Sequence, residues 1–239
     1  MKEITQIRKL SIWIFFIPLI AINSCLIISQ NPEILDNTFL AVDQIGRSAF
    51  SIPYIDGSLS ISRASRTFPQ YLIFKPAMFA TAFLLFIYWK NNNQLVNNLY
   101  ATNLNYKFKT FGILSALFLV IHSIFLGVKF EFDLYKLFRR VVMLAFIIFE
   151  IVAQAYLVAT LYSVKKKLYK FINLKILSLK IILVSTLIIV AVISIPIISL
   201  PGDNFLGLNL KSFKHALEWD YFLAVISFYL LTFFMWKRN

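Results

Sequence analysis

Two glutamates and two histidines are the side chains of this sequence best suited to acid–base chemistry. Glu150 and His122 lie inside two different long apolar segments. His215 and Glu218 stand three residues apart near the start of the last apolar segment, and they share a helix face if that helix begins early. Carboxylate and imidazole groups act as general acids and bases on esters and amides. These four residues are the candidates for catalysis, and the sequence alone assigns no catalytic residue among them.

The sequence offers these groups no obvious nucleophile, metal or cofactor. The serines of the stretch SLSISRAS lack the GxSxG pattern of a nucleophile elbow. Cys25 is the only cysteine, and two histidines are too few for a histidine-rich metal site. We therefore predict no metal and no cofactor, and whether the protein is an enzyme stays open.

A second group of charged residues is suited to binding a lipid headgroup. An arginine can hold a phosphate through two parallel hydrogen bonds, and a lysine just inside an apolar segment adds a positive charge at the depth of the phosphates. The residues of this group stand near the ends of apolar segments: Asp56, Arg63, Arg66, Lys75, Glu218 and Asp220.

Several of these residues also have ordinary structural interpretations. Lys75 can extend its ammonium to the membrane surface. The ring of His122 can donate to a backbone carbonyl. Arg63 and Arg66 can form ion pairs with Asp56 and so fold the loop that carries them.

Two of the acidic residues also have an ordinary structural interpretation, and Glu150 does not. Glu218 and Asp220 can be acids at a helix N-terminus, where the helix dipole favours them, and Lys214 stands one turn before Glu218. Glu150 has no such alternative, because it lies about 13 Å inside its segment and its short side chain cannot reach the surface. It must face other helices, with His122 as its nearest titratable partner in depth.

Six apolar segments must position these groups. The chain of 239 residues is 59% hydrophobic and only 15% charged, with a mean hydropathy of +0.75. Segments of about 20 apolar residues are the length of a membrane-spanning helix. We predict an all-α, polytopic membrane helix bundle that forms a single domain over residues 1–239. Its long external loop covers residues 30–70, and its spans cover residues 10–29, 71–89, 111–128, 141–162, 181–200 and 216–236.

The flanks of the segments carry further information. Trp89, Tyr162 and Trp236 stand at predicted span ends, where amphipathic rings prefer the membrane interface. The first span continues past Cys25 without an Ala-x-Ala site, which favours a retained helix over a cleaved signal peptide.

Basic residues predict the orientation. With the N-terminus inside, the inner segments hold 14 basic residues and one acid, so the positive-inside rule places both termini in the cytoplasm. The run Lys165–Lys180 is then a cytoplasmic loop against anionic headgroups. The net charge of +13 is spread between apolar segments, which argues against nucleic acid. Every ionisable residue within a span then lies in the outer half or near the midplane. We therefore expect a cavity that opens outward, narrows towards Glu150 and lies under the external loop.

Two regions resemble motifs of the Frag/DRAM/Sfk family of six-span membrane proteins. The match in the external loop is Pro53-Tyr54-Ile55-Asp56-Gly57, with Pro69-Gln70 and Ile73-Phe74 leading into the second span, and the last span matches at Glu218-Trp219, Phe222 and Thr232-Phe233. The family's serine before the aspartate is missing. Gln70 stands where the family has an acid, and Arg139-Arg140 stand where it has a histidine.

The resemblance implies lipid handling at the lumenal or outer leaflet. The family includes proteins that help remodel the lipid of glycosylphosphatidylinositol anchors, among them the N-terminal domain of the yeast ceramide-remodelling protein. The membrane is the cytoplasmic one in a bacterium, and an endomembrane or the plasma membrane in a eukaryote.

Three functions follow from the sequence. The first is a protein that binds, organises or helps remodel membrane lipids from the outer side, with or without chemistry of its own. The second is a membrane-embedded acyl hydrolase or transferase. The third is a small proton-coupled transporter built on Glu150 and His122. The near absence of ionisable groups from the inner half of the spans argues against transport. Membrane lipids are the predicted partners, and the sequence identifies no protein partner.

Overall fold

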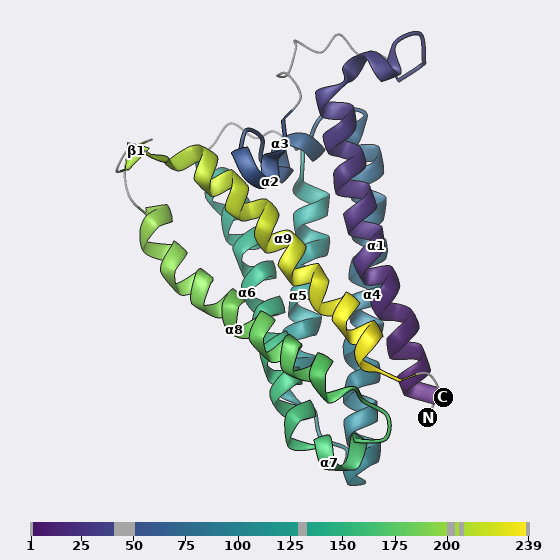
Figure 1. Cartoon of the computed structure of the whole chain (residues 1–239). Helices are drawn as coiled ribbons and strands as arrows, with labels where there is room; N and C mark the ends of the chain where they lie inside the picture. Colours follow the sequence, from purple (N-terminus) through teal and green to yellow (C-terminus); the bar gives the residue numbers. More distant parts are fainter. Residues whose placement is uncertain (1, 41–50, 129–132, 200–203, 206–207, 238–239) are drawn as a thin grey trace.

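The computed structural model describes residues 2–40, 51–128, 133–199, 204–205 and 208–237. Within this part of the chain, six helices are long and apolar enough to cross a membrane. They are α1 (Lys2–Gln30), α4 (Gln70–Tyr100), α5 (Lys107–Phe125), α6 (Asp133–Ser163), α8 (Leu174–Ser199) and α9 (Leu210–Met235), and they pack as one bundle (Figure 1). The prediction of an all-α, six-span membrane protein is confirmed.

Short elements cover the two ends of the bundle. One end carries α2 (Pro53–Asp56) and α3 (Ile61–Ser65), and the other carries α7 (Lys165–Leu168) beside both chain termini (Figure 1). The 3₁₀ helix η1 (Pro32–Leu35) follows α1. The strands β1 (Asn204–Phe205) and β2 (Leu208–Asn209) pair in antiparallel fashion between α8 and α9.

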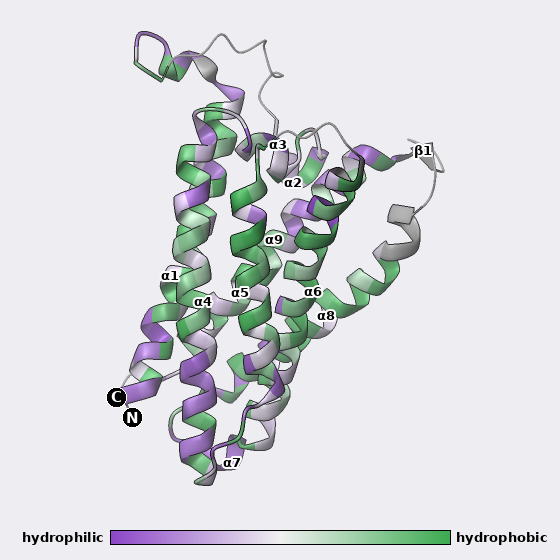
Figure 2. Ribbon diagram, turned by 180° about the vertical axis from the view of Figure 1, so that it is seen from behind, coloured by the Kyte–Doolittle hydropathy of each residue, from purple (hydrophilic) through white to green (hydrophobic). Residues whose placement is uncertain are grey.

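The outer surface of the bundle is suited to lipid. Hydrophobic residues dominate the middle of the helices, and hydrophilic residues gather towards the ends (Figure 2). Large apolar side chains such as Trp13, Phe83 and Ile182 are exposed along the helices. In water such a surface would promote aggregation, whereas in a bilayer it meets acyl chains.

The interior is rich in aromatic residues. Trp89, Tyr88 and Tyr229 are fully buried and meet edge to face, with ring centroids 5.0 Å apart for Tyr88–Trp89 and for Tyr88–Tyr229. Gly112 of α5 allows this packing, because a Cβ atom there would overlap the Trp89 ring. The centre of the bundle is therefore held by ring packing between α4, α5 and α9.

Several helices extend beyond the predicted spans. α4 continues past Trp89 to Tyr100, α6 begins at Asp133 instead of residue 141, and α9 begins at Leu210 instead of residue 216. The early start of α9 is explained by Asn209, whose side chain accepts hydrogen bonds from the backbone N–H groups of the first turn at 3.0 and 3.2 Å.

The predicted interfacial tryptophans are also corrected. Trp89 and Trp236 are fully buried in the bundle, while Tyr162 is exposed. The run Lys165–Lys180 is only partly a loop, since α8 begins at Leu174. Lys180 therefore lies inside a spanning helix, where it is fully buried.

Candidate functional site

A cavity of about 120 Å³ lies between the helices. Residues of α1, α3, α4, α5, α6 and α9 form its walls, and most of these residues are apolar. Its lining also contains polar side chains: Ser62, Thr81, His122, Glu150, Glu218, Tyr221 and Tyr229.

Helical spacing brings the polar residues to the cavity. Glu218, Phe222, Val225 and Tyr229 recur every three or four residues along α9 and form one stripe. Glu150 belongs to a similar stripe on α6. The cavity therefore extends along α9 from Glu218 to Tyr229.

At the deep end of the cavity, Glu150 is held by three hydrogen-bond donors. Ser115 donates to Oε2 at 2.5 Å, Gln154 donates to Oε1 at 3.1 Å, and Tyr229 also donates to Oε1. The Gln154 amide also donates to the backbone carbonyl of Val225 at 3.2 Å. The carboxyl group thus joins α5, α6 and α9. The side chains of Glu150 and of its three donors are all buried.

At the other end, Glu218 lies under α3. Its carboxyl group accepts a hydrogen bond from the backbone of Ser62. Ser62 lines the cavity together with Ile61, so α3 closes this end of the cavity.

The segment from α2 to α3 is docked on α9. The indole N–H of Trp219 donates to the carbonyl of Leu59 at 2.7 Å, and Nδ1 of His215 lies 2.9 Å from the carbonyl of Gly57. The ring centroids of Tyr54 and Trp219 are 4.8 Å apart. We call residues 53–65 the lid, because α2 and α3 lie at one end of the bundle beside α9 (Figure 1), and Ile61 and Ser62 of α3 line the cavity.

Tyr54 also fastens the lid to α1. Its hydroxyl donates to Oδ1 of Asn23 at 3.2 Å. Burial raises the pKa of the Tyr54 phenol more than the bond to Asn23 lowers it, so the hydroxyl keeps its proton and stays a donor.

The side chain of His122 lines the cavity, and its ring makes no hydrogen bond with any residue that the structure describes. Within the described residues, no backbone carbonyl accepts a hydrogen bond from this ring, so the interpretation that it does so stays a prediction. His122 lines the same cavity as Glu150 and Glu218.

Other predicted site residues lie outside the cavity. Asp56 accepts hydrogen bonds from the backbone of Ile52 at 2.9 Å and of Ser58 at 2.8 Å. Its slight burial raises the pKa, but these bonds outweigh it, so the pKa of Asp56 lies below its usual value. Lys75 donates to the carbonyl of Ile124 at 3.3 Å, at the end of α5, where a cation complements the helix dipole.

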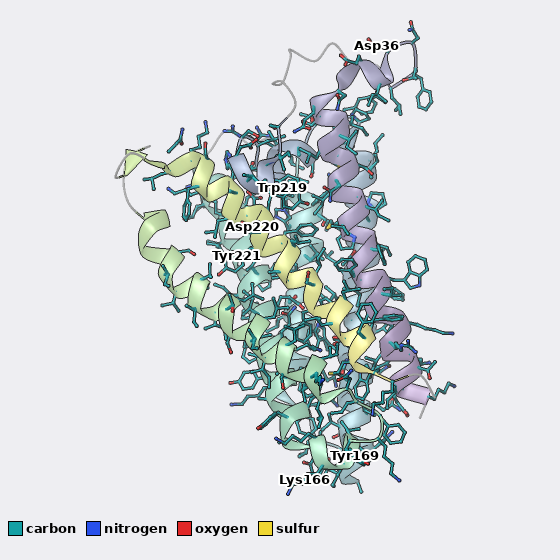
Figure 3. All side chains as sticks on the ribbon, viewed as in Figure 1. Asp36, Lys166, Tyr169, Trp219, Asp220 and Tyr221 are labelled. Carbon is teal, nitrogen blue, oxygen red and sulfur yellow. The ribbon has the colours of Figure 1, made fainter. Side chains whose placement is uncertain are left out.

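Arg63, Arg66, His215 and Asp220 also lie outside the cavity lining. Asp220 follows Trp219 on α9 and is exposed (Figure 3). The structure therefore brings together three predicted residues, His122, Glu150 and Glu218, and separates the rest from them. Glu218 and Asp220 are not helix-terminal acids either, since α9 begins at Leu210, more than two turns earlier.

The sequence interpretation missed Ser115, Tyr229 and Lys180. Tyr229 was detectable, because it stands 11 residues after Glu218, which is three helical turns along the same face. Ser115 carries no comparable signal, since a lone serine in an apolar helix usually bonds its own backbone. Lys180 was read as the end of a loop.

No protein-family model, no curated protein and no solved structure matches this chain. The resemblance to the Frag/DRAM/Sfk family therefore rests on the motifs themselves. Those motifs meet in space, because Tyr54 of the first packs on Trp219 of the second.

Proposed function

We propose that this integral membrane protein binds a membrane lipid from the end of the bundle that carries the lid. The observation that carries the proposal is the cavity, whose lining is mostly apolar and includes one imidazole, that of His122, and two carboxyl groups, those of Glu150 and Glu218. Apolar walls suit an acyl chain, and a few polar groups fix the orientation of a ligand.

The size of the cavity limits what it holds. A dry protein cavity of about 150 Å³ accommodates a benzene molecule. At about 120 Å³, this cavity has room for part of one acyl chain and not for two chains. A lipid with two chains would keep the second chain in the bilayer. The polar part of the lipid would then lie near Glu218 and Ser62, under the lid.

A binding or accessory role is favoured over catalysis. Within the described residues, no hydrogen bond joins His122 to Glu150, Glu218 or Ser62. A nucleophile and its base are normally within hydrogen-bond reach of each other. Kinship with the Frag/DRAM/Sfk family, which the contact between the two motifs supports, would place the chain among proteins that handle lipids.

A lipid hydrolase or acyltransferase is the second candidate. It is favoured by the imidazole of His122, which makes no hydrogen bond with the described residues and shares a cavity with two carboxyl groups. A bound ester could bring its own atoms between them. On this mechanism His122 would transfer the proton, because imidazole is the commonest general base near neutral pH.

The positive-inside rule supports placing both termini in the cytoplasm. The termini and α7 lie at the same end of the bundle (Figure 1), and that end holds Lys165, Lys166 and Lys167. Because Lys180 lies inside the bundle, this side loses one of its basic residues, but it still holds more basic residues than the other side. The lid then faces the periplasm, a lumen or the cell exterior.

The test compares Glu218→Gln with Asp220→Asn, after reconstitution into defined phospholipid vesicles and repurification. Both changes remove one carboxylate from α9, but only Glu218 lines the cavity. Mass spectrometry of the lipids that stay with the protein should show one species enriched on the wild type and on Asp220→Asn, and lost from Glu218→Gln.

The same samples separate the two candidates. A new lipid species that forms during incubation with the wild type, and not with His122→Gln, would establish the enzyme. Equal lipid retention by wild type and Glu218→Gln would refute the proposed binding site.

A further inference from the structure

Lys180 is a lysine enclosed by the membrane-spanning bundle. It lies on α8, and its side chain is 0% exposed. Its Nζ donates to Oγ1 of Thr232 at 2.6 Å and lies 3.8 Å from the centre of the Phe228 ring. Among the residues that the structure describes, no carboxylate pairs with it. Since it is fully enclosed, it cannot extend to the membrane surface, and a buried ionisable group in a membrane protein is by default a functional candidate.

A row of hydroxyl groups leads from Lys180 towards the cavity. Oγ1 of Thr232 lies 3.4 Å from the hydroxyl of Tyr88, whose ring meets the ring of Tyr229 at 5.0 Å. The hydroxyl of Tyr229 donates to Glu150, which lines the cavity. Four helices, α4, α6, α8 and α9, therefore contribute to one polar row. We call these five residues the seam.

The side chains that contact Lys180 are uncharged. α9 presents Thr232 and Phe228 to Lys180, and Tyr88 of α4 lies beside Thr232. Arg8 of α1 contacts α9 one residue further on, where it donates to the carbonyl of Phe233 at 3.3 Å and stacks on that ring. Glu150 is the only buried carboxylate on the described part of α6, so it is the acidic end of the seam.

Buried polar atoms beside the seam need partners. The indole nitrogen of Trp89, Oδ1 of Asn92 and Oε1 of Gln154 are buried and have no hydrogen-bond partner among the described residues. Trp89 packs on both tyrosines of the seam, and Gln154 is bonded to Glu150. Such atoms are normally satisfied by ordered water, which can also relay protons.

We propose that the seam carries protons between the lipid cavity and the inner half of the bundle, with Glu150 and Lys180 as its two ends. The hydroxyl of Thr232, which donates to the carbonyl of Phe228 at 2.9 Å, first turns towards Tyr88. The ammonium of Lys180 then releases a proton to the oxygen of Thr232 as Thr232 passes its own proton to Tyr88. A water molecule takes the proton of Tyr88 and gives one to Tyr229, whose hydroxyl proton goes to Glu150. One N–H bond breaks at Lys180 and one O–H bond forms at Glu150; every carrier between them regains a proton, and no electron is transferred.

This inference does not depend on which lipid the cavity binds. It removes the objection to transport that the sequence raised, because an ionisable group does occupy the inner half. The sequence suggested His122 as the partner of Glu150 in a proton relay, but no hydrogen bond joins His122 to the seam among the described residues. The structure offers Lys180 as the second ionisable group instead.

The test is proton flux into vesicles that contain the full-length protein and an enclosed pH-sensitive dye, driven by an inside-negative potassium diffusion potential. The wild type should acidify the vesicles faster than protein-free vesicles do. Lys180→Met and Tyr88→Phe should reduce the flux to the protein-free rate. Lys175→Met is the matched control, because Lys175 is an exposed lysine on the same helix, and it should keep the wild-type flux.

The variants also separate this proposal from lipid binding. Glu218→Gln should lose the retained lipid and keep the flux, whereas Lys180→Met should keep the lipid and lose the flux. Tyr88→Phe covers the case in which Lys180→Met does not fold, since it removes only one hydroxyl. Wild-type flux equal to that of protein-free vesicles, or full flux in folded Tyr88→Phe, would overturn the proposal.

Discussion

At the scale of single residues, Glu150 shows how an acidic group is kept inside an apolar bundle. A buried carboxyl group is costly unless its oxygens are hydrogen-bonded. Here Ser115, Gln154 and Tyr229 supply donors from three helices. The residue that looks most functional in the sequence is therefore also a structural tie, and the two roles have to be separated by experiment.

Tyr229→Phe should destabilise the protein by about 1–3 kcal/mol, because it removes one donor from a buried carboxyl group and leaves the ring packing in place. Denaturant unfolding in detergent micelles measures the effect. Tyr156→Phe serves as the control, since Tyr156 is an exposed tyrosine on α6 that stacks on Phe111. Equal stabilities of the two variants would show that the bond to Glu150 contributes little.

At the scale of elements, the lid depends on where α9 begins. Because α9 starts at Leu210, His215 and Trp219 are both helical and reach the carbonyls of Gly57 and Leu59. Gly57 has a left-handed backbone with φ +59°, and a Cβ atom there would overlap the carbonyl of Ser212. The end of α2 thus lies directly against α9.

Gly57→Ala should detach the lid from α9. A non-glycine residue in the left-handed conformation costs about 1–2 kcal/mol, and the overlap with Ser212 adds to that cost. Hydrogen exchange measured by mass spectrometry should become faster in residues 53–65 and stay unchanged in α4 and α5. Ser58→Ala, at the next and exposed position, is the control and should leave the exchange of α2 and α3 near that of the wild type.

At the scale of the whole molecule, the bundle has two unlike ends. The lid covers one end, and the termini and the lysines of α7 occupy the other (Figures 1 and 2). Lys166 and Tyr169 mark the second end, and Asp36 marks the first (Figure 3). In a membrane these two ends face different compartments, and the positive-inside rule predicts that the end with the termini faces the cytoplasm.

Cysteine labelling tests this orientation. The native Cys25 is buried, so it should react slowly with a membrane-impermeant maleimide. In intact cells, Ser58→Cys should be labelled at once, and Lys166→Cys only after the membrane is permeabilised. The reverse pattern would place the lid in the cytoplasm and would invert the proposed side of lipid entry.

The amino-acid sequence by itself determined the six spans and the depth of Glu150. Hydropathy is a sum over neighbouring residues, so a long apolar run predicts a membrane helix whatever the helix packs against. Gln154 stands four residues after Glu150, so helical periodicity puts both on one face, and the structure joins these two side chains by a hydrogen bond. The depth of His122 and Glu218 along their spans, estimated from the helical rise, led to the prediction of an outward-opening cavity.

Only the tertiary structure decided which polar residues meet. Asp56 and Lys75 bond to nearby backbone groups, although their positions in the sequence are typical of a headgroup site. Lys180 resembles the end of a loop, but Thr232 and Phe228 of another helix enclose it. The physical reason is that the transfer of a residue into lipid depends on its own chemistry, whereas the partner that satisfies a buried charge comes from a helix distant in sequence, and only packing brings that helix near.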